Sequence, residues 1–304
     1  MAPVVAPSGE QLSIEAGGYA ATVTESGGAL RALTHAGRQL VDGFADDAMS
    51  SGGRGQLLMP WPNRIRDGRY SFGGKDYQLG LTEPARHNAS HGLARWAAWT
   101  PVEVAADAVT LAYRVMAQTG YPWTLDLRVT YAVDDGGLTV TQSATNRASS
   151  PAPYASGAHP YLGAGPGPID GWTLHLPAAT RCLTDDERLL PTGVEDVTGT
   201  DYDYRTPRPV GGTVFNHAFT DLERDADGVA TVGLDGPDGT TELWVDDHHG
   251  WLLVYSADDT GSPRVSLAVE PMTAPVDAYN SGDGLVTLEP GATFAATWGI
   301  RAGS

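Results

Sequence analysis

A chain of 304 residues, 41% of them hydrophobic, can bury a sizeable core in one large domain or in two small ones. The formal net charge of −18 argues against nucleic acid or an anionic membrane as a partner, because both require a basic surface. The single cysteine, Cys182, excludes an intrachain disulfide and a zinc site built from several thiolates. The single lysine, Lys75, stands beside Gly73 and Gly74 in an expected turn, which argues against imine chemistry.

The predicted elements are almost all short strands. The 38 glycines and 21 prolines are dispersed between apolar runs, a pattern typical of strands joined by tight turns. Alternation of apolar and polar residues predicts a hairpin at 70–79 on a Gly73-Gly74 turn and another at 125–145. In chain order the expected strands are residues 20–25, 70–72, 77–79, 109–115, 125–133, 138–145, 242–245, 251–256, 265–270 and 295–300.

Sustained helical periodicity is nearly absent, and no linker, repeat or break in composition divides the chain. We therefore expect residues 1–304 to form a single domain, an all-β antiparallel sandwich. No stretch approaches 18 apolar residues, and the N-terminal segment lacks a basic region followed by an apolar one. These features predict a cytoplasmic protein with no signal peptide and no membrane span.

Polar, aromatic and glycine residues crowd together in four segments outside any simple strand pattern. These segments are residues 60–70, 83–96, 156–161 and 269–280. Taken together and in this order, they resemble the aldose 1-epimerase (galactose mutarotase-like) family, from about Gly55 to Ile300. The resemblance is carried by Asn63-Arg64-Ile65, His91-Gly92, His159-Pro160-Tyr161 and the segment around Glu270. It implies a galactose mutarotase-like β-supersandwich, no cofactor, and a sugar bound in an open cleft.

Glu270 is the first candidate for a catalytic residue. On the expected strand 265–270, Ser266 and Ala268 share its face and are small enough to leave room for a ligand. Pro271 is expected to stop the ladder of hydrogen bonds. The pattern by itself also fits a carboxylate on a solvated strand face. The resemblance implies that Glu270 is the catalytic base.

Two histidines complete the expected catalytic set. A lone histidine is more often structural than catalytic, but the resemblance places the catalytic acid at His159. His91 precedes Gly92, whose small size lets the backbone approach closely, and by resemblance it contacts the sugar near its ring oxygen. His87, four residues earlier, invites a metal-ligand interpretation, yet no third ligand is evident, so no metal is expected. His248 and His249 are expected on opposite faces of a strand, where they cannot chelate together.

Sugar-binding residues follow from the same resemblance. Arg64 matches the family's sugar-binding arginine. An Asp-His pair of more distant relatives has its nearest counterpart at Asn216-His217, so either Asn216 or Asp221 could supply that contact. Trp96 and Tyr161 could stack on a sugar face, although core packing is the commoner explanation for one aromatic residue.

The function predicted from these residues is interconversion of the α and β anomers of a free hexose by an aldose 1-epimerase (mutarotase). Two alternatives remain: a non-catalytic carbohydrate-binding module, and a mutarotase for an anionic sugar such as a sugar phosphate or sulfoquinovose. The net charge of −18 favours a neutral hexose, whereas Arg66, expected on the same strand face as Arg64, could hold an anionic group. Glycoside hydrolysis normally uses two carboxylates, and only Glu270 lies in a convincing motif.

Overall fold

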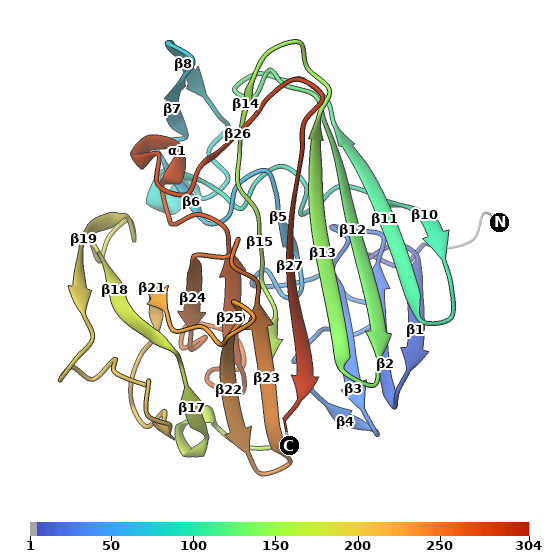
Figure 1. The fold of residues 1–304 in the computed structure, drawn as a ribbon, viewed down its shortest axis with the longest axis vertical. Helices are drawn as coiled ribbons and strands as arrows, with labels where there is room; N and C mark the ends of the chain where they lie inside the picture. Colours follow the sequence, from blue (N-terminus) through green and yellow to red (C-terminus); the bar gives the residue numbers. More distant parts are fainter. Residues whose placement is uncertain (1–4, 304) are drawn as a thin grey trace.

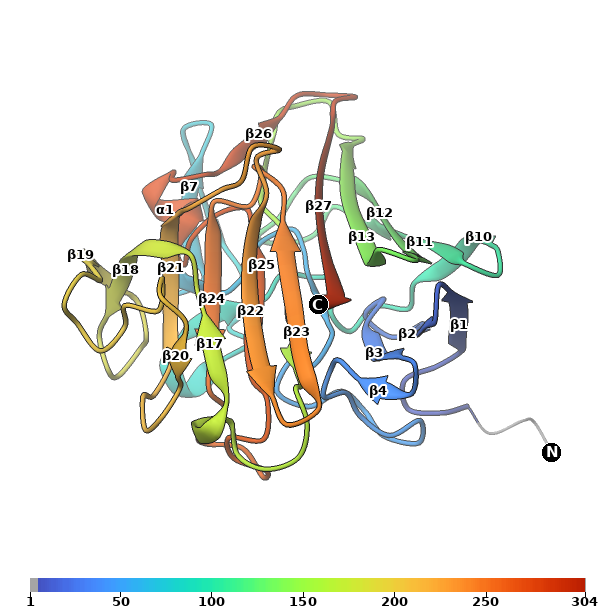
Figure 2. The ribbon, with the colours of Figure 1, turned by 60° about the horizontal axis from the view of Figure 1, so that its bottom comes forward.

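The computed structural model describes residues 5–303, and two large antiparallel sheets dominate it (Figures 1 and 2). The nine-stranded sheet contains, in spatial order, β10 (Thr100–Val104), β11 (Ala108–Val115), β12 (Leu125–Asp134), β13 (Gly137–Asn146), β27 (Thr293–Ala302), β23 (Gly239–Val245), β22 (Ala230–Gly236), β17 (Thr173–His175) and β20 (Arg208–Pro209). The eight-stranded sheet contains β19 (Pro191–Asp196), β18 (Ala178–Thr184), β21 (Asn216–Leu222), β24 (Trp251–Tyr255), β25 (Leu267–Met272), β15 (Gly157–Ala158) and β5 (Leu57–Leu58), with β16 (Tyr161–Leu162) also paired to β25. The predicted all-β antiparallel sandwich is confirmed.

Smaller elements surround these two sheets. A four-stranded N-terminal sheet contacts β11, β12 and β13. It consists of β1 (Gln11–Ala16), β2 (Tyr19–Thr24), β3 (Leu30–His35) and β4 (Arg38–Gln39). The paired short strands are β6 (Arg64–Arg66) with β9 (Asn88–Ser90), β7 (Arg69–Phe72) with β8 (Lys75–Gln78), and β14 (Ala152–Tyr154) with β26 (Val286–Leu288). The helical turns are η1 (Pro84–Arg86), η2 (Ile169–Gly171) and α1 (Ala278–Ser281). No helix among residues 5–303 is long and apolar enough to span a membrane.

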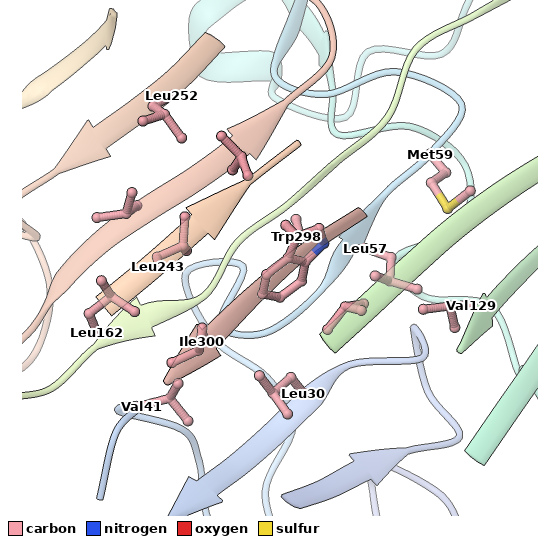
Figure 3. Packing of buried hydrophobic residues seen from close by; sticks show 14 of the residues in the cluster. Leu30, Val41, Leu57, Met59, Val129, Leu162, Leu243, Leu252, Trp298 and Ile300 are labelled. Carbon is pink, nitrogen blue, oxygen red and sulfur yellow. The ribbon is translucent and has the colours of Figure 1, made fainter. Parts of the chain in front are cut away.

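The largest cluster of buried apolar side chains lies between the sheets. Figure 3 shows part of this cluster, with Leu243, Trp298 and Ile300 from the nine-stranded sheet and Leu162 and Leu252 from the eight-stranded one. The cluster also takes in residues of the N-terminal sheet and reaches from Ile14 to Ile300. Burial of this area is the main force that holds the layers together.

Most of the expected strands are observed within a few residues of their predicted ends. The hairpin of β12 and β13 runs in continuous register from Leu125↔Asn146 to Asp134↔Gly137. The hairpin of β7 and β8 turns on Gly73 and Gly74, both with positive φ, as the sequence predicts.

Two strand predictions are wrong in detail. The strand expected at 265–270 is observed at Leu267–Met272 and is buried along its whole length, while Val265 lies outside it, 41% exposed. Pro271 does not end the ladder, because it pairs with Leu252 of β24. On its other side β25 pairs with β15 and β16, and the pairing is interrupted between these two short strands. Pro271, which has no backbone N–H, is accommodated on that side.

His248 and His249 do not lie on a strand, as the sequence analysis expected. They occupy the connection between β23 and β24. His249 is fully buried, and its Nδ1 atom lies 2.7 Å from Oδ1 of Asp246. His249 therefore belongs to the packing of this turn.

Candidate active site

Strand register brings the two principal catalytic candidates together. Gly157 pairs with Met272, and Tyr161 pairs with Ala268. Both pairs belong to one register, which places His159 opposite Glu270 on the edge of β25. Directly opposed residues on antiparallel chains have side chains on the same face, close enough to interact. The motifs around His159 and Glu270, which are distant in sequence, therefore meet because β15 and β16 pair with β25 in a single register.

Two rows of cross-strand neighbours on this outer face of the eight-stranded sheet contain five residues that line a cavity: His159, Asn216, Leu253, Tyr255 and Glu270. The first row contains Ala218, Leu253, Glu270 and His159. The second row, two residues along each strand and therefore on the same face, contains Asn216, Tyr255, Ala268 and Tyr161. Neither Ser266 nor Ala268 lines the cavity, contrary to the expectation that they leave room for a ligand. Ala268 is buried in a small cluster with Tyr161 and Ala257, and Ser266 donates a hydrogen bond to Asp42.

The cavity has a volume of about 320 Å³, and most of its wall residues come from the first half of the chain. Gly52 and Gly53 form one side, and the β6–β9 region forms another. The remaining lining residues are Asn63, Arg64, Thr82, Glu83, Arg86, Ser90, His91, Arg95, Trp96, Leu189 and Asp259.

Glu270 and His159 are in direct contact. Nε2 of His159 lies 3.2 Å from Oε1 of Glu270, and both residues are almost fully buried. Burial raises the pKa of Glu270 to about 8, against a smaller lowering by the charge of Arg64. Burial also lowers the pKa of His159 to about 3, assisted by nearby arginines. Between these values the pair carries one proton in total.

His91 lies beside this pair, with its ring centroid 5.7 Å from that of His159. Its Nδ1 atom accepts a hydrogen bond of 3.2 Å from the backbone N–H of Asn63, which leaves the ring proton on Nε2. Burial lowers the pKa of His91, so the ring is neutral. A neutral imidazole with a protonated Nε2 is a hydrogen-bond donor in the cavity.

Arg64 is held in place by carboxylate and amide oxygens. Its Nε and Nη2 atoms donate to Glu83 at 2.7 and 2.9 Å, and Nη1 donates to Asn63 Oδ1 at 3.2 Å. Such a bidentate pair fixes the guanidinium at the cavity wall.

The remaining predicted sugar contacts divide into two groups. Asn216 and Trp96 line the cavity. Tyr161 is buried behind His159, with ring centroids 5.0 Å apart and planes 12° apart, and it does not line the cavity. Asp221 also lies outside it: it stands five residues along β21 from Asn216, and its carboxylate accepts a hydrogen bond from Thr180. It lies near the other end of β21 from Asn216, roughly 16 Å away.

Several lining residues were not among the predicted site residues. Glu83, Arg86 and Arg95 lie in the segment 83–96, which the sequence analysis singled out. Their place in that segment was the one signal that could have identified them. Gly52, Gly53, Tyr255 and Asp259 carry no such signal, because only pairing and packing bring them to the cavity. Arg66 does not line the cavity, and its Nε atom lies 3.4 Å from Oδ2 of Asp277.

Residues 5–303 contain no group of three histidine, cysteine or acidic side chains placed to hold a metal ion. His87 lies 2.8 Å from Asp67 and is mostly exposed. The cavity presents acid–base groups and hydrogen-bond donors, a set suited to a polyhydroxylated ligand.

The architecture places the chain among galactose mutarotase-like proteins. A GalM/aldose epimerase homologue from C. elegans superimposes with a TM-score of 0.85 at 20% identity, covering 97% of this chain and 99% of that one. A galactose 1-epimerase from Lactobacillus acidophilus superimposes with a TM-score of 0.79 at 20% identity, covering 95% and 92%. At this level of identity the likeness concerns the fold.

Sequence comparison gives the family. The family model for aldose 1-epimerase matches residues 10–301. The chain is 33% identical over 285 residues to the uncharacterized protein YihR of Escherichia coli K12, covering 93% of this chain and 90% of that protein. It is also 38% identical over 158 residues to the galactose mutarotase of Rattus norvegicus, covering 49% of this chain and 44% of that enzyme. The chain belongs to the aldose 1-epimerase family.

Proposed function

We propose that this protein catalyses the interconversion of the α and β anomers of a free hexose. The observation that carries the proposal is the direct contact of His159 and Glu270 on the floor of a cavity rich in hydrogen-bonding groups. A general acid and a general base are the groups that sugar-ring opening requires. Membership in the aldose 1-epimerase family supports the same reaction class.

The reaction needs only proton transfer. The Glu270 carboxylate takes the proton of the anomeric hydroxyl while His159 gives a proton to the ring oxygen. The bond between the anomeric carbon and the ring oxygen breaks, and the open-chain aldehyde forms. Rotation about the adjacent carbon–carbon bond presents the other face, and the same two groups reverse the transfers. The sugar and the enzyme are both regenerated, so no co-reactant is consumed.

The proton of the pair must lie on His159 for this chemistry. In the free site the raised pKa of Glu270 and the lowered pKa of His159 favour the neutral arrangement, with the proton on the carboxyl group. Oε2 of Glu270 is buried and has no hydrogen-bond partner among the described residues. A sugar hydroxyl that donates to this oxygen stabilises the carboxylate and thereby moves the proton to His159. Substrate binding and activation of the pair are then one event.

Arg64, Asn216, Trp96 and His91 are proposed to hold the sugar. Arg64 and the Nε2–H of His91 are donors, Asn216 can both donate and accept, and Trp96 offers a flat apolar face. This set suits the hydroxyl groups and the C–H surfaces of a hexose.

An anionic sugar remains the second candidate, because two arginines besides Arg64 line the cavity. Arg86 is 3.5 Å from Glu83. Arg95 has no carboxylate within salt-bridge distance in residues 5–303, and its guanidinium lies 5.4 Å from the ring centroid of Trp96. Burial lowers the pKa of Arg95, which is the mark of a partly desolvated cation. A phosphate or sulfonate group would pair with it.

A non-catalytic sugar-binding module is the third candidate function. Binding alone does not need a buried carboxyl group against a buried imidazole, and such burial costs free energy unless a partner compensates it. The contact between Glu270 and His159 therefore favours the enzyme.

The test is exchange NMR on glucose, galactose, glucose 6-phosphate and sulfoquinovose at low and moderate salt. We expect faster exchange of the neutral hexoses, since the net charge of −18 repels anions at long range. A large rate advantage for either anion that is lost in Arg95→Met, and kept in the control Arg66→Met, would instead establish the anionic substrate. Binding of these sugars without any acceleration of exchange would support the binding module.

A further inference from the structure

Three groups form a stack that ends at His159. The Cζ atom of Arg54 lies 4.3 Å from the ring centroid of Tyr161. His159 also stacks on that ring, with centroids 5.0 Å apart and planes 12° apart. Cations and aromatic faces attract one another at such separations. The Tyr161 ring thus contacts both the guanidinium of Arg54 and the imidazole of His159.

Arg54 is fixed from behind by an acidic residue. Its Nε and Nη2 atoms each lie 3.2 Å from Oδ2 of Asp42, which also accepts a hydrogen bond of 2.7 Å from Ser266. The backbone N–H of Asp42 donates to the carbonyl oxygen of Tyr161 at 2.8 Å. Neither Arg54 nor Asp42 lines the cavity. Any influence of this pair on a bound sugar must pass through the residues in front of it.

The orientation of the His159 ring needs such support. The Nδ1 atom of His159 is buried and has no hydrogen-bond partner among the described residues. In many catalytic histidines a hydrogen bond at the second ring nitrogen fixes the ring plane. Here the ring is confined between the face of Tyr161 and Gly53, where a Cβ atom would lie 2.7 Å from Cδ2 of His159. Contact with a stacked face takes the place of a hydrogen bond.

We propose that Arg54 and Asp42 are a positioning pair that acts through Tyr161 on the ring plane and proton affinity of His159. The proposal rests on the function proposed for His159 and Glu270, and it assigns roles to two residues outside the cavity. Arg54 holds Tyr161 flat against the imidazole, and its positive charge disfavours the imidazolium. The carboxylate of Asp42 offsets that charge. The two residues therefore have opposite effects on the proton of the pair.

Charged and titratable groups approach the imidazole from every side. Glu270 contacts Nε2, His91 lies at the ring edge, and three arginines act through their charge. Those arginines are Arg54, Arg95 and Arg64, given in order of their effect in lowering the pKa of His159. Arg54 has the largest effect of the three, although it is the one outside the cavity.

The test uses two variants with expected shifts of opposite sign. In Arg54→Met the loss of a cation should raise the pH at which the His159–Glu270 pair releases its last proton, by about 0.5 unit. In Asp42→Asn the cation loses its partner, and that pH should fall by a similar amount. The readout is side-chain NMR of labelled histidine in the sugar-free protein, with the His159 signal assigned through His159→Asn. Because no sugar is present, the result does not depend on whether the protein is a mutarotase.

Anomer exchange by the same variants gives a second readout. Arg54→Met should lower kcat about tenfold with little change in KM, because the ring is less confined and the acid is weaker. Arg224→Met is the matched control, since Arg224 is tied to the carbonyl oxygens of Gly228, Asp246 and His249 away from the cavity. It should leave the His159 titration and kcat unchanged, whatever it does to Tm.

Two outcomes would overturn the proposal. One is that the titration pH of the His159–Glu270 pair stays unchanged in every one of the two variants, Arg54→Met and Asp42→Asn, that folds. The other is the same shift in Tyr161→Phe, which keeps the ring but removes the hydrogen bond of 2.7 Å to the carbonyl oxygen of Gly52. That result would show that the effect runs through the glycine loop. The protein could lack mutarotase activity and still show the expected titration shifts, upward in Arg54→Met and downward in Asp42→Asn. That result would refute the proposed function and leave the positioning role intact.

Discussion

His159 stands opposite Glu270 in the register of β25, with Nε2 of the imidazole 3.2 Å from Oε1 of the carboxyl group. Each group is buried, and each lacks a further partner at its second polar atom among the described residues. We therefore propose that the two side chains act as one unit that shares a proton. The first predictions address this unit.

Replacement of Glu270 by Gln should remove the base and leave the fold intact. We expect a fall of at least about 10² in the rate of anomer exchange, measured by exchange NMR or polarimetry. Circular dichroism should be unchanged. Glu242→Gln, in β23 away from the cavity and paired with Arg301, is the matched control and should keep full activity. Near-normal turnover by Glu270→Gln would remove this residue from the mechanism.

Activity should depend on pH through the single proton of the pair. The active form lies between the pKa of about 3 for His159 and the pKa of about 8 for Glu270, both in the free site. As pH rises through about 8 the pair loses its last proton, so kcat/KM should fall; between pH 5 and 7 it should be nearly flat. A profile that falls only on the acid side would argue against a protonated His159 as the acid.

His159 and His91 should differ in their effect on kinetics. His159 is proposed to transfer a proton, whereas His91 is a neutral donor whose Nδ1 is occupied by the N–H of Asn63. His159→Asn should therefore lower kcat by about 10² or more, and His91→Asn should lower it less and act largely on KM. An equal or larger loss of kcat in His91→Asn would reverse the assignment.

Glu270→Gln should also make the protein more stable at neutral and alkaline pH. The carboxyl group titrates near 4.5 when solvated and near 8 when buried. The raised pKa favours the folded state below about pH 4.5, and this advantage is lost as pH rises to about 8. Gln cannot ionise, so the variant should gain on the order of 2–4 kcal/mol at pH 8 and little at pH 4.5. Urea unfolding at both pH values measures the difference, and equal stabilities at pH 8 would contradict it.

Chelation should leave the activity unchanged. Proton transfer by Glu270 and His159 needs no Lewis acid, and residues 5–303 offer no cluster of three ligand side chains. We expect the same exchange rate before and after strong chelation and desalting. A rate that is lost and then restored by a divalent ion would contradict this prediction.

The sequence by itself determined the fold class and picked out the principal candidate residues. Alternation in residues 125–145 specified the β12–β13 hairpin, because a half-buried strand must alternate apolar and polar residues. The motifs around Arg64, His91, His159 and Glu270 named residues that all line one cavity.

Only the tertiary structure decided which residues meet. Asn216 lines the cavity and Asp221 does not, because they stand near opposite ends of β21 and Asp221 accepts a hydrogen bond from Thr180 instead. Arg95 lines the cavity and Arg66 does not, although an expected extended strand placed Arg66 beside Arg64. The pairing of β25 with β24 on one side and with the chain around His159 on the other cannot be read from any local pattern. Cross-strand register depends on contacts between distant segments, so the floor of the site, and Arg54 and Asp42 behind it, exist only in the folded chain.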